Sequence, residues 1–195
     1  MKNYRDYYFK KAKKENYPAR SVYKLKEMDK KFQIFNKAKK VLDLGAAPGS
    51  WTKYAKQRIG NKGIIVAIDL NPLQIPISHG IIFHQCDILN RDEDFIGLME
   101  DHMPFDVVMS DMAPKTTGIK ITDQTRSLEL AENAFDIACN FLKKNGIFLV
   151  KIFNGPDVSH FMARVKKYFK KVKMYKPKSS RSESKEIFIL GINKK

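Results

Sequence analysis

The sequence predicts an α/β fold, in which a mostly parallel sheet of about seven strands has helices on both faces and one reversed strand at its edge. Short runs such as residues 64–68 are apolar at every position, as in strands that are buried on both faces. Segments with apolar residues at helical spacing alternate with these runs. In such sheets ligands bind beyond the carboxyl ends of the strands, so polar residues at those ends become the candidates for a site.

The elements follow in order along the chain. A basic helix over residues 5–16 ends before Pro18, and a second helix covers residues 19–34. The apolar face of the second helix consists of Val22, Leu25, Met28 and Phe32. Strands are predicted at residues 40–44, 64–68, 81–83, 105–110, 147–153, 171–175 and 186–192, and helices at 51–59, 92–102, 123–143 and 157–169. The helix over 123–143 is expected to bury Leu128, Ala131, Phe135, Ala138 and Leu142.

The chain of 195 residues fits a single domain, 1–195, with a basic helical segment at residues 1–38. Its net charge of +16 is concentrated at two ends, because residues 1–40 hold 14 Lys and Arg against 4 Asp and Glu, and residues 164–195 hold 12 against 2. The middle part, 41–163, holds 11 against 15. The aromatic residues of the basic ends are Tyr4, Tyr7, Tyr8, Phe9, Tyr17, Tyr23, Tyr168, Phe169 and Tyr175.

Basic charge with interleaved aromatic rings is suited to RNA, whose phosphates need cations and whose unpaired bases need stacking surfaces. A lysine-rich solubilising surface is the simpler alternative. An anionic membrane would also attract such ends, but no lipid-anchor motif accompanies them and no segment approaches the roughly 20 apolar residues that span a bilayer. We therefore expect an RNA partner and no membrane partner, with the protein acting as a monomer.

Cysteine and histidine usage indicates neither a disulfide framework nor a metal site. Cys86 and Cys139 lie far apart, and the four histidines show no metal-ligand spacing. The sequence has no secretory signal, which favours a reducing compartment, the cytoplasm by default. An organelle matrix stays open, because a removed presequence would be invisible.

The most informative stretch is VLDLGAAPGSW, residues 41–51, where an apolar strand passes through a small-residue loop into a helix. Gly45 can adopt positive φ, and Gly49 is expected to let a ligand approach the backbone. The N–H groups of the next helix can receive a carboxylate. Ala47 and Pro48 break the G-x-G-x-x-G pattern, so the loop favours S-adenosylmethionine (SAM) over a dinucleotide. An ordinary strand–helix turn is the alternative.

Three carboxylates stand at predicted strand ends, and a fourth, Asp43, lies inside the first strand just before the loop. Asp69 can accept hydrogen bonds from both ribose hydroxyls of an adenosine cofactor, and Asp87 from the adenine amino group, although each could also be a turn residue. Asp43 is expected either to hold loop N–H groups or to meet the cofactor's amino group, and Asp111 faces the reactive end of the pocket. Trp51 either packs on the cofactor or fills the core.

The motifs LDLGAAPGSW, AIDL, SDMAP, LVKIFNG and SSRSESKEIFIL occur in this order, and over about residues 18–193 the chain resembles the FtsJ ribosomal RNA 2′-O-methyltransferases. The resemblance implies a Rossmann-like SAM-dependent methyltransferase fold and a tetrad of Lys24, Asp111, Lys151 and Glu186, with Lys151 central. It also implies SAM contacts from Gly49, Trp51, Asp69, Asp87 and Asp111.

Two positions qualify the resemblance. Ser50 replaces a second Gly found in many bacterial relatives, and Ser is small enough to leave the pocket intact. Gly45 and Met112 differ from the transfer-RNA branch of the family, which tends to carry Cys and Gly there, and so favour the ribosomal branch.

The implied reaction is methylation of a ribose 2′-hydroxyl, most simply of a uridine in large-subunit ribosomal RNA. Lys151 interrupts the apolar run 147–153, and an unpaired ammonium there would be expensive, which favours a functional lysine. Its role as a base or as an orienting donor stays open, since Lys24 would lower its pKa while Asp111 and Glu186 would raise it.

Other functions fit the sequence less well. Ribose methylation of transfer RNA or of an mRNA cap would use the same tetrad. A nicotinamide oxidoreductase lacks its G-x-G-x-x-G here, and an RNA-binding module without catalysis would not need four intact tetrad residues. The loop after Asp111 has no aromatic residue to stack a base, which disfavours amine methylation.

Overall fold

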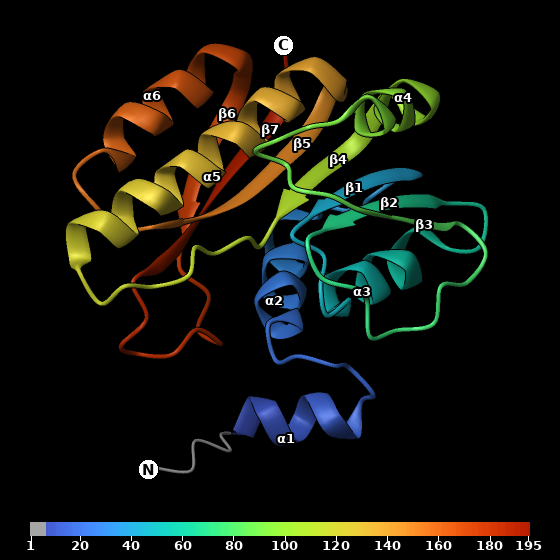
Figure 1. The fold of residues 1–195 in the computed structure, drawn as a ribbon, viewed down its shortest axis with the longest axis horizontal. Coiled ribbons are helices and arrows are strands. Elements are labelled where there is room, and N and C mark those ends of the chain that lie inside the picture. Colours follow the sequence, from blue (N-terminus) through green and yellow to red (C-terminus); the bar gives the residue numbers. More distant parts are fainter. Residues whose placement is uncertain (1–6) are drawn as a thin grey trace.

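The computed structural model describes residues 7–195 and contains one seven-stranded sheet flanked by helices (Figure 1). The strands are β1 Lys40–Leu44, β2 Ile64–Asp69, β3 Ile81–Gln85, β4 Phe105–Ser110, β5 Leu142–Phe153, β6 Phe169–Tyr175 and β7 Glu186–Lys194. The helices are α1 Tyr7–Lys14, α2 Val22–Phe32, α3 Ser50–Ile59, α4 Glu93–His102, α5 Lys120–Phe141 and α6 Val158–Tyr168. The expected basic helix over 5–16 corresponds to α1, and Lys2, Tyr4 and Arg5 lie outside the described residues.

The sheet has the order β3-β2-β1-β4-β5-β7-β6 and is mostly parallel, as predicted. Strands β3, β2, β1, β4 and β5 pair in parallel, and β7 runs antiparallel to both β5 and β6. The reversed strand is therefore second from the edge, and the prediction that it lies at the edge was wrong. Residues 187–190 of β7 are buried, so both sides of this apolar strand are covered, while lysine-rich β6 takes the solvent edge.

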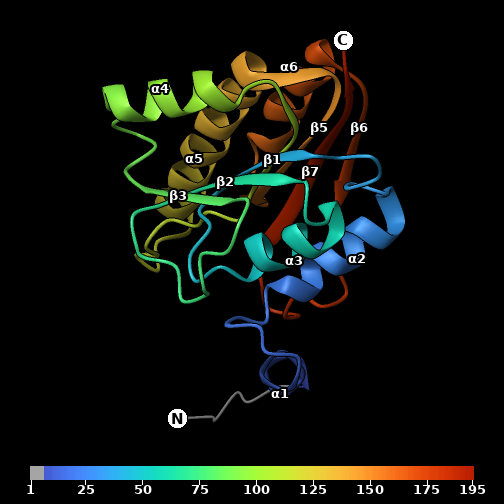
Figure 2. The ribbon, with the colours of Figure 1, turned by 90° about the vertical axis from the view of Figure 1, so that its right-hand side faces the viewer.

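Helices cover both faces of the sheet, which confirms the predicted layers (Figures 1 and 2). The side chains of each strand alternate between two cores. Leu42 and Val108 pack with Phe135 and Phe161 on the side of α4, α5 and α6. Val41, Val107 and Leu149 pack with the residues of α2 and α3 on the other side. A third, smaller cluster joins α1 to this second side through Ala12, Tyr17, Val22 and Tyr23.

Several boundaries differ from the expected ones. Helix α5 begins at Lys120 rather than residue 123, and it ends at Phe141 because Leu142 already pairs with Phe105 in the sheet. Strand β5 is longer than the predicted 147–153, and a register irregularity between Phe105 and Val107 accommodates the extra residues. In the part of the chain that the structure describes, none of the helices has the length and apolar character needed to span a bilayer.

Candidate active site

Two lysines and two carboxylates that are distant in sequence meet at the carboxyl end of the sheet. Lys24 comes from α2, Asp111 follows β4, Lys151 lies in β5 and Glu186 begins β7. The Lys24 Nζ atom lies 2.5 Å from Glu186 Oε2, and the Lys151 Nζ atom lies 3.1 Å from Asp111 Oδ1 and 3.8 Å from Glu186 Oε1. Lys151 also donates to the main-chain carbonyl of Asp111. The four predicted tetrad residues therefore form one connected ion-pair cluster.

Burial makes this cluster chemically unusual. The Lys151 side chain is only 5% exposed and that of Lys24 12%, although isolated lysines are almost never buried. Burial opposes ionisation of Glu186, but the charges of Lys24 and Lys151 and the hydrogen bonds from Lys24 and Ser184 outweigh it and lower the pKa of this carboxyl. Glu186 is thus held as a carboxylate between two ammonium groups.

A cavity of about 610 Å³ opens beside this cluster, along the carboxyl ends of the first four strands. Asp111 belongs to both, so the cavity and the tetrad adjoin at this residue. The lining includes residues that follow β1, β2, β3 and β4, together with one face of α5. The predicted site residues among them are Gly45, Ala47, Asp69, Asp87 and Asp111. This placement agrees with the expectation that ligands sit outside the carboxyl ends of parallel strands.

The two predicted adenosine-binding carboxylates are held in different ways. Asp69 Oδ2 accepts a hydrogen bond from the Ala47 N–H at 2.9 Å, and its Oδ1 accepts from the Asn71 N–H. Asp87 Oδ1 accepts from the Leu89 N–H. Each carboxylate is fixed by main-chain donors and still lines the cavity, so the turn role and the ligand role that the sequence left open are compatible.

The small-residue loop between β1 and α3 adopts the backbone that its glycines allow. Gly45 has φ of 77° and Gly49 has φ of 108°. A β-carbon at Gly49 would lie 2.7 Å from the Ile75 side chain, so the packing of Ile75 also requires a glycine here. The ligand role of Gly49 stays a prediction. At Gly45 a β-carbon would collide with Met112.

Asp43 is fully buried in β1 and contributes to packing between β1 and α3. Its Oδ2 accepts a hydrogen bond from the Thr52 hydroxyl at 2.6 Å, and its Oδ1 has no hydrogen-bond partner among residues 7–195. Burial raises the pKa of Asp43 to about 7, against the Thr52 hydrogen bond, and the charges of Asp111 and Asp69 add to the rise. The contact that the structure shows is therefore with α3, not with the loop N–H groups.

Trp51 lies in the core, which was one of its two predicted roles. The ring is 2% exposed, packs 5.9 Å from the Phe188 ring and donates its indole N–H to the Ser21 carbonyl. Pro48, Gly49 and Trp51 are absent from the cavity lining formed by the described part of the chain. Ser50, the position at which the sequence departs from the family pattern, exchanges two hydrogen bonds with the Ala19 backbone and fixes the segment that leads to α2.

Comparison with known proteins decides the family. The profile of the FtsJ-like methyltransferases matches residues 17–194. "Ribosomal RNA large subunit methyltransferase E" of Nitratidesulfovibrio vulgaris is 53% identical over 188 residues, which covers 96% of this chain and 92% of the relative. The protein of the same name from Bdellovibrio bacteriovorus is 50% identical over 196 residues, covering 99% and 98%.

This chain belongs to the FtsJ-like methyltransferase family. Solved structures agree with the fold. A ribosomal RNA methyltransferase of Plasmodium falciparum superposes with a TM-score of 0.77 at 28% identity, covering 91% of this chain and 98% of that one. An O-methyltransferase of Streptomyces achromogenes, solved in complex with SAM, has a TM-score of 0.61 at 14% identity, a likeness of fold alone.

Sequence reasoning missed several residues of the cavity in this FtsJ-like methyltransferase. Ile88 and Leu89 follow β3, and Met112 follows Asp111, so strand-end position was a usable signal for these three. Arg126 and Glu129 line the cavity from α5 and carried no such signal, because their contribution depends on how the helix packs. Among residues 7–195, no group of three or more His, Cys, Asp and Glu side chains is arranged to hold a metal ion.

Proposed function

We propose that this protein transfers a methyl group from SAM to the 2′-hydroxyl of a ribose in large-subunit ribosomal RNA, at a uridine. The observation that carries the proposal is the convergence of Lys24, Asp111, Lys151 and Glu186 beside the cavity. Membership of a methyltransferase family and the names of its bacterial relatives support the reaction and the substrate.

The cavity fits the proposed cofactor. Its volume of about 610 Å³ falls within the range of small-molecule sites. Asp69 and Asp87 would hold the ribose hydroxyls and the adenine amino group, and Gly45 and Ala47 border the same space. The carboxylates of Asp69, Asp87 and Asp111, which line the cavity at neighbouring strand ends, also suit a ligand that carries positive charge. When bound, SAM supplies the methyl group on a positively charged sulfonium.

The tetrad is proposed to position the acceptor. Lys151 is held from two sides by Asp111 and Glu186, and Lys24 in turn fixes Glu186. A lysine restrained in this way can orient the lone pair of the ribose hydroxyl by donating a hydrogen bond, or can remove its proton as a base. The pH dependence of single-turnover rates distinguishes these roles, because only a base must lose its proton before transfer.

The direct test is to map 2′-O-methyl groups after incubating the protein and SAM with candidate RNAs. We expect transfer to large-subunit ribosomal RNA, either free or in the assembled subunit. Preferential methylation of transfer RNA or capped RNA would indicate the same reaction on a different RNA substrate. RNA binding without single-turnover transfer would contradict the proposal as a whole.

We further propose that residues 1–195 act as one domain and as a monomer. Contacts between the first and last parts of the chain support one unit, since Arg20 donates to the Ser179 carbonyl and Glu27 accepts from the Lys178 N–H. Light scattering of the active protein with and without RNA tests the oligomeric state.

A further inference from the structure

One segment joins the far end of the sheet to the mouth of the active site and carries only positive charge. Residues 158–182 contain nine Lys and Arg and no Asp or Glu. They form α6, the edge strand β6 and the connection toward Glu186. The basic charge at this end of the sequence therefore extends well beyond the pocket mouth, where the proposed reaction takes place.

The lysines of β6 are available to a partner. Lys170, Lys171 and Lys173 are exposed, and β6 is the outermost strand of the sheet, as Figure 2 shows. Among residues 7–195, the ammonium groups of Lys171 and Lys173 have no hydrogen-bond or ion-pair partner. Their spacing of two residues places them on the same face of the strand. Lys176 and Lys178, also exposed, continue the basic charge toward the tetrad.

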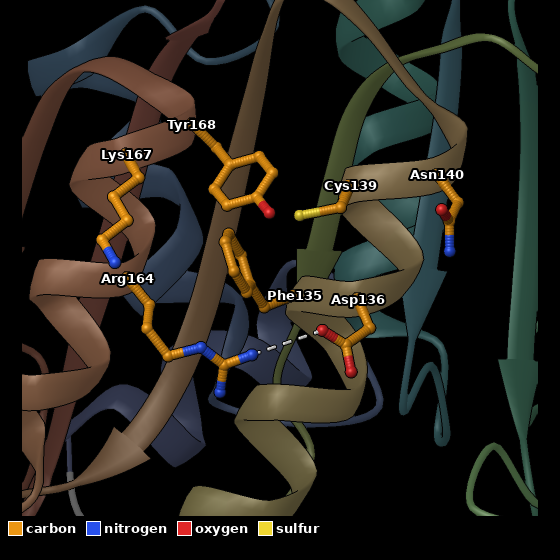
Figure 3. A pocket seen from close by; sticks show the side chains of 7 residues that line it. All are labelled: Phe135, Asp136, Cys139, Asn140, Arg164, Lys167 and Tyr168. Carbon is orange, nitrogen blue, oxygen red and sulfur yellow. Dashed lines mark ion pairs between the residues drawn. The ribbon is translucent and has the colours of Figure 1, made fainter.

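A cavity of about 450 Å³ lies between α5 and α6, and acidic residues of α5 offset part of the basic charge there (Figure 3). Arg164 in this cavity forms ion pairs with Glu132 and with Asp136, the latter at 3.6 Å. Its charge is thereby neutralised, and Asp136 would repel a phosphate. Lys167 lies on α6 like Arg164, across the cavity from Asp136. An anion is therefore better accommodated along β6 than beside α5.

We propose that Lys171 and Lys173, with Lys176 and Lys178, form a track that binds the phosphate backbone of the RNA substrate away from the modified nucleotide. This proposal rests on the proposed function. Lys171 and Lys173 lie about 7 Å apart along β6, and Lys176 and Lys178 follow the end of the strand, so the track can contact successive phosphates. A polyanion is the partner that such an extended row of exposed cations fits.

Lysines on an edge strand also prevent strand pairing between molecules. Charge reversal separates this role from RNA binding, because glutamate blocks an edge as well as lysine does. The test therefore uses Lys171→Glu, Lys173→Glu and the double variant. The matched control is Lys62→Glu, in the exposed turn before β2.

The readouts are affinity for a large-subunit ribosomal RNA transcript that the parent methylates, its salt dependence, and kinetics. We expect the double variant to bind at least about tenfold more weakly and its log–log salt slope to shrink by roughly 2, about one per lost phosphate contact. KM for RNA should rise while kcat at saturating RNA stays unchanged, and Lys62→Glu should match the parent.

Two results would overturn the track. One is a monomeric double variant with the parent's RNA affinity and salt slope, which would leave these lysines as edge protection only. The other is an equal loss in Lys62→Glu, which would indicate unspecific attraction by net charge. If the parent itself transferred no methyl group to RNA, the proposed function would fail instead, and the two failures are therefore distinguishable.

Discussion

At the scale of single residues, Lys151 is the side chain whose environment is hardest to explain without a function. It occupies a buried position in β5, between Val150 and Ile152 of the core, and it is surrounded by two carboxylates. A buried ion pair is weak evidence for stability, because desolvation offsets much of the attraction. The cluster is better explained by the chemistry of a site than by the needs of the fold.

Replacing Lys151 by Ala should reduce methyl transfer by at least about 10²-fold if this residue serves the acceptor oxygen as proposed. SAM affinity should survive nearly intact, since Lys151 does not line the cofactor cavity. Single-turnover assays at saturating RNA and calorimetry with SAM measure the two effects. Lys143→Ala is the matched control, because Lys143 is in the same strand and pairs with Asp106 away from the site. Substantial turnover by Lys151→Ala would refute the assignment.

Asp69 allows a test of the cofactor site. Asp69→Ala should weaken SAM binding by roughly 1–3 kcal/mol, the cost of leaving polar partners of the ligand unpaired. The same change frees the Ala47 and Asn71 N–H groups, so thermal unfolding must accompany the calorimetry. Asp101→Ala, at an exposed position of α4, controls for loss of a carboxylate. Unchanged affinity in a folded Asp69→Ala protein would remove Asp69 from the site.

Asp43 should make stability depend on pH in the direction opposite to most carboxylates. Its pKa is raised to about 7, so between the unfolded value and this value the native state holds a proton that the unfolded state has lost. The free energy of unfolding therefore decreases as pH rises through this window. Relative to Asp43→Asn, the parent should lose about 2–3 kcal/mol between about pH 5 and pH 8. If the free energy of unfolding of the two proteins, measured with urea, changed equally across that pH range, Asp43 would not be protonated in the folded state.

At the scale of elements, Lys194, the last residue of β7, and Lys195, which follows it, connect the sheet to the ends of two helices. Lys194 Nζ donates to the carbonyls of Cys139 and Leu142 at 2.6 and 2.7 Å, at the end of α5. Lys195 Nζ donates to the carbonyls of Lys166 and Lys167, at the end of α6. Cations at these positions satisfy carbonyls that a helix end leaves without partners and oppose the helix dipole.

Lys194→Met should therefore lower the free energy of unfolding by about 1–2 kcal/mol, and Lys195→Met by less, because Lys195 is exposed and better solvated. Urea denaturation of both variants beside the parent measures this. Methyl transfer at a temperature well below unfolding should be unchanged, since both residues lie at the opposite end of β7 from Glu186. Equal stability of Lys194→Met and the parent would contradict the capping role.

The elements also show how far local patterns reach. Apolar runs located the strands inside the sheet and helical spacing located the amphipathic helices, because burial leaves a direct mark on composition. The place of β7 between β5 and β6 left no such mark, since strand order depends on pairing between segments far apart. The contact between Ile75 and Gly49 left no mark either, because Ile75 reaches this glycine only in the folded state.

At the scale of the whole molecule, the candidate site combines residues that no local pattern could join. Lys24 and Glu186 are 162 positions apart, and Lys24 alone has the character of a solvated helix residue. Resemblance to a family supplied this pairing, and the fold brings the two side chains together as that resemblance implied. The pairing of Asp43 with Thr52 and the burial of Trp51 depend on how α3 packs, which the sequence left open.

The arrangement of charge over the molecule leads to the last prediction, that α1 contributes to RNA binding. Lys10, Lys13 and Lys14 are exposed on α1, whereas Lys11 lies near Glu15 and over the Tyr23 ring. Deleting residues 1–16 would also remove Ala12 from the small core that it forms with Tyr17, Val22 and Tyr23. Substitution of the three exposed lysines by Gln is therefore the cleaner experiment, because it removes charge and keeps the helix.

This triple variant should bind large-subunit ribosomal RNA more weakly. Its log–log salt slope should be smaller by up to about 3, because each phosphate contact that is lost lowers the number of counterions released on binding. SAM affinity should not change, since the cavity is lined by none of these lysines. Lys37→Gln with Lys62→Gln, at exposed positions elsewhere, controls for net charge. If the α1 variant kept the parent's RNA affinity and salt slope, these lysines would only solubilise the protein, and RNA would have to reach the tetrad over other parts of the surface.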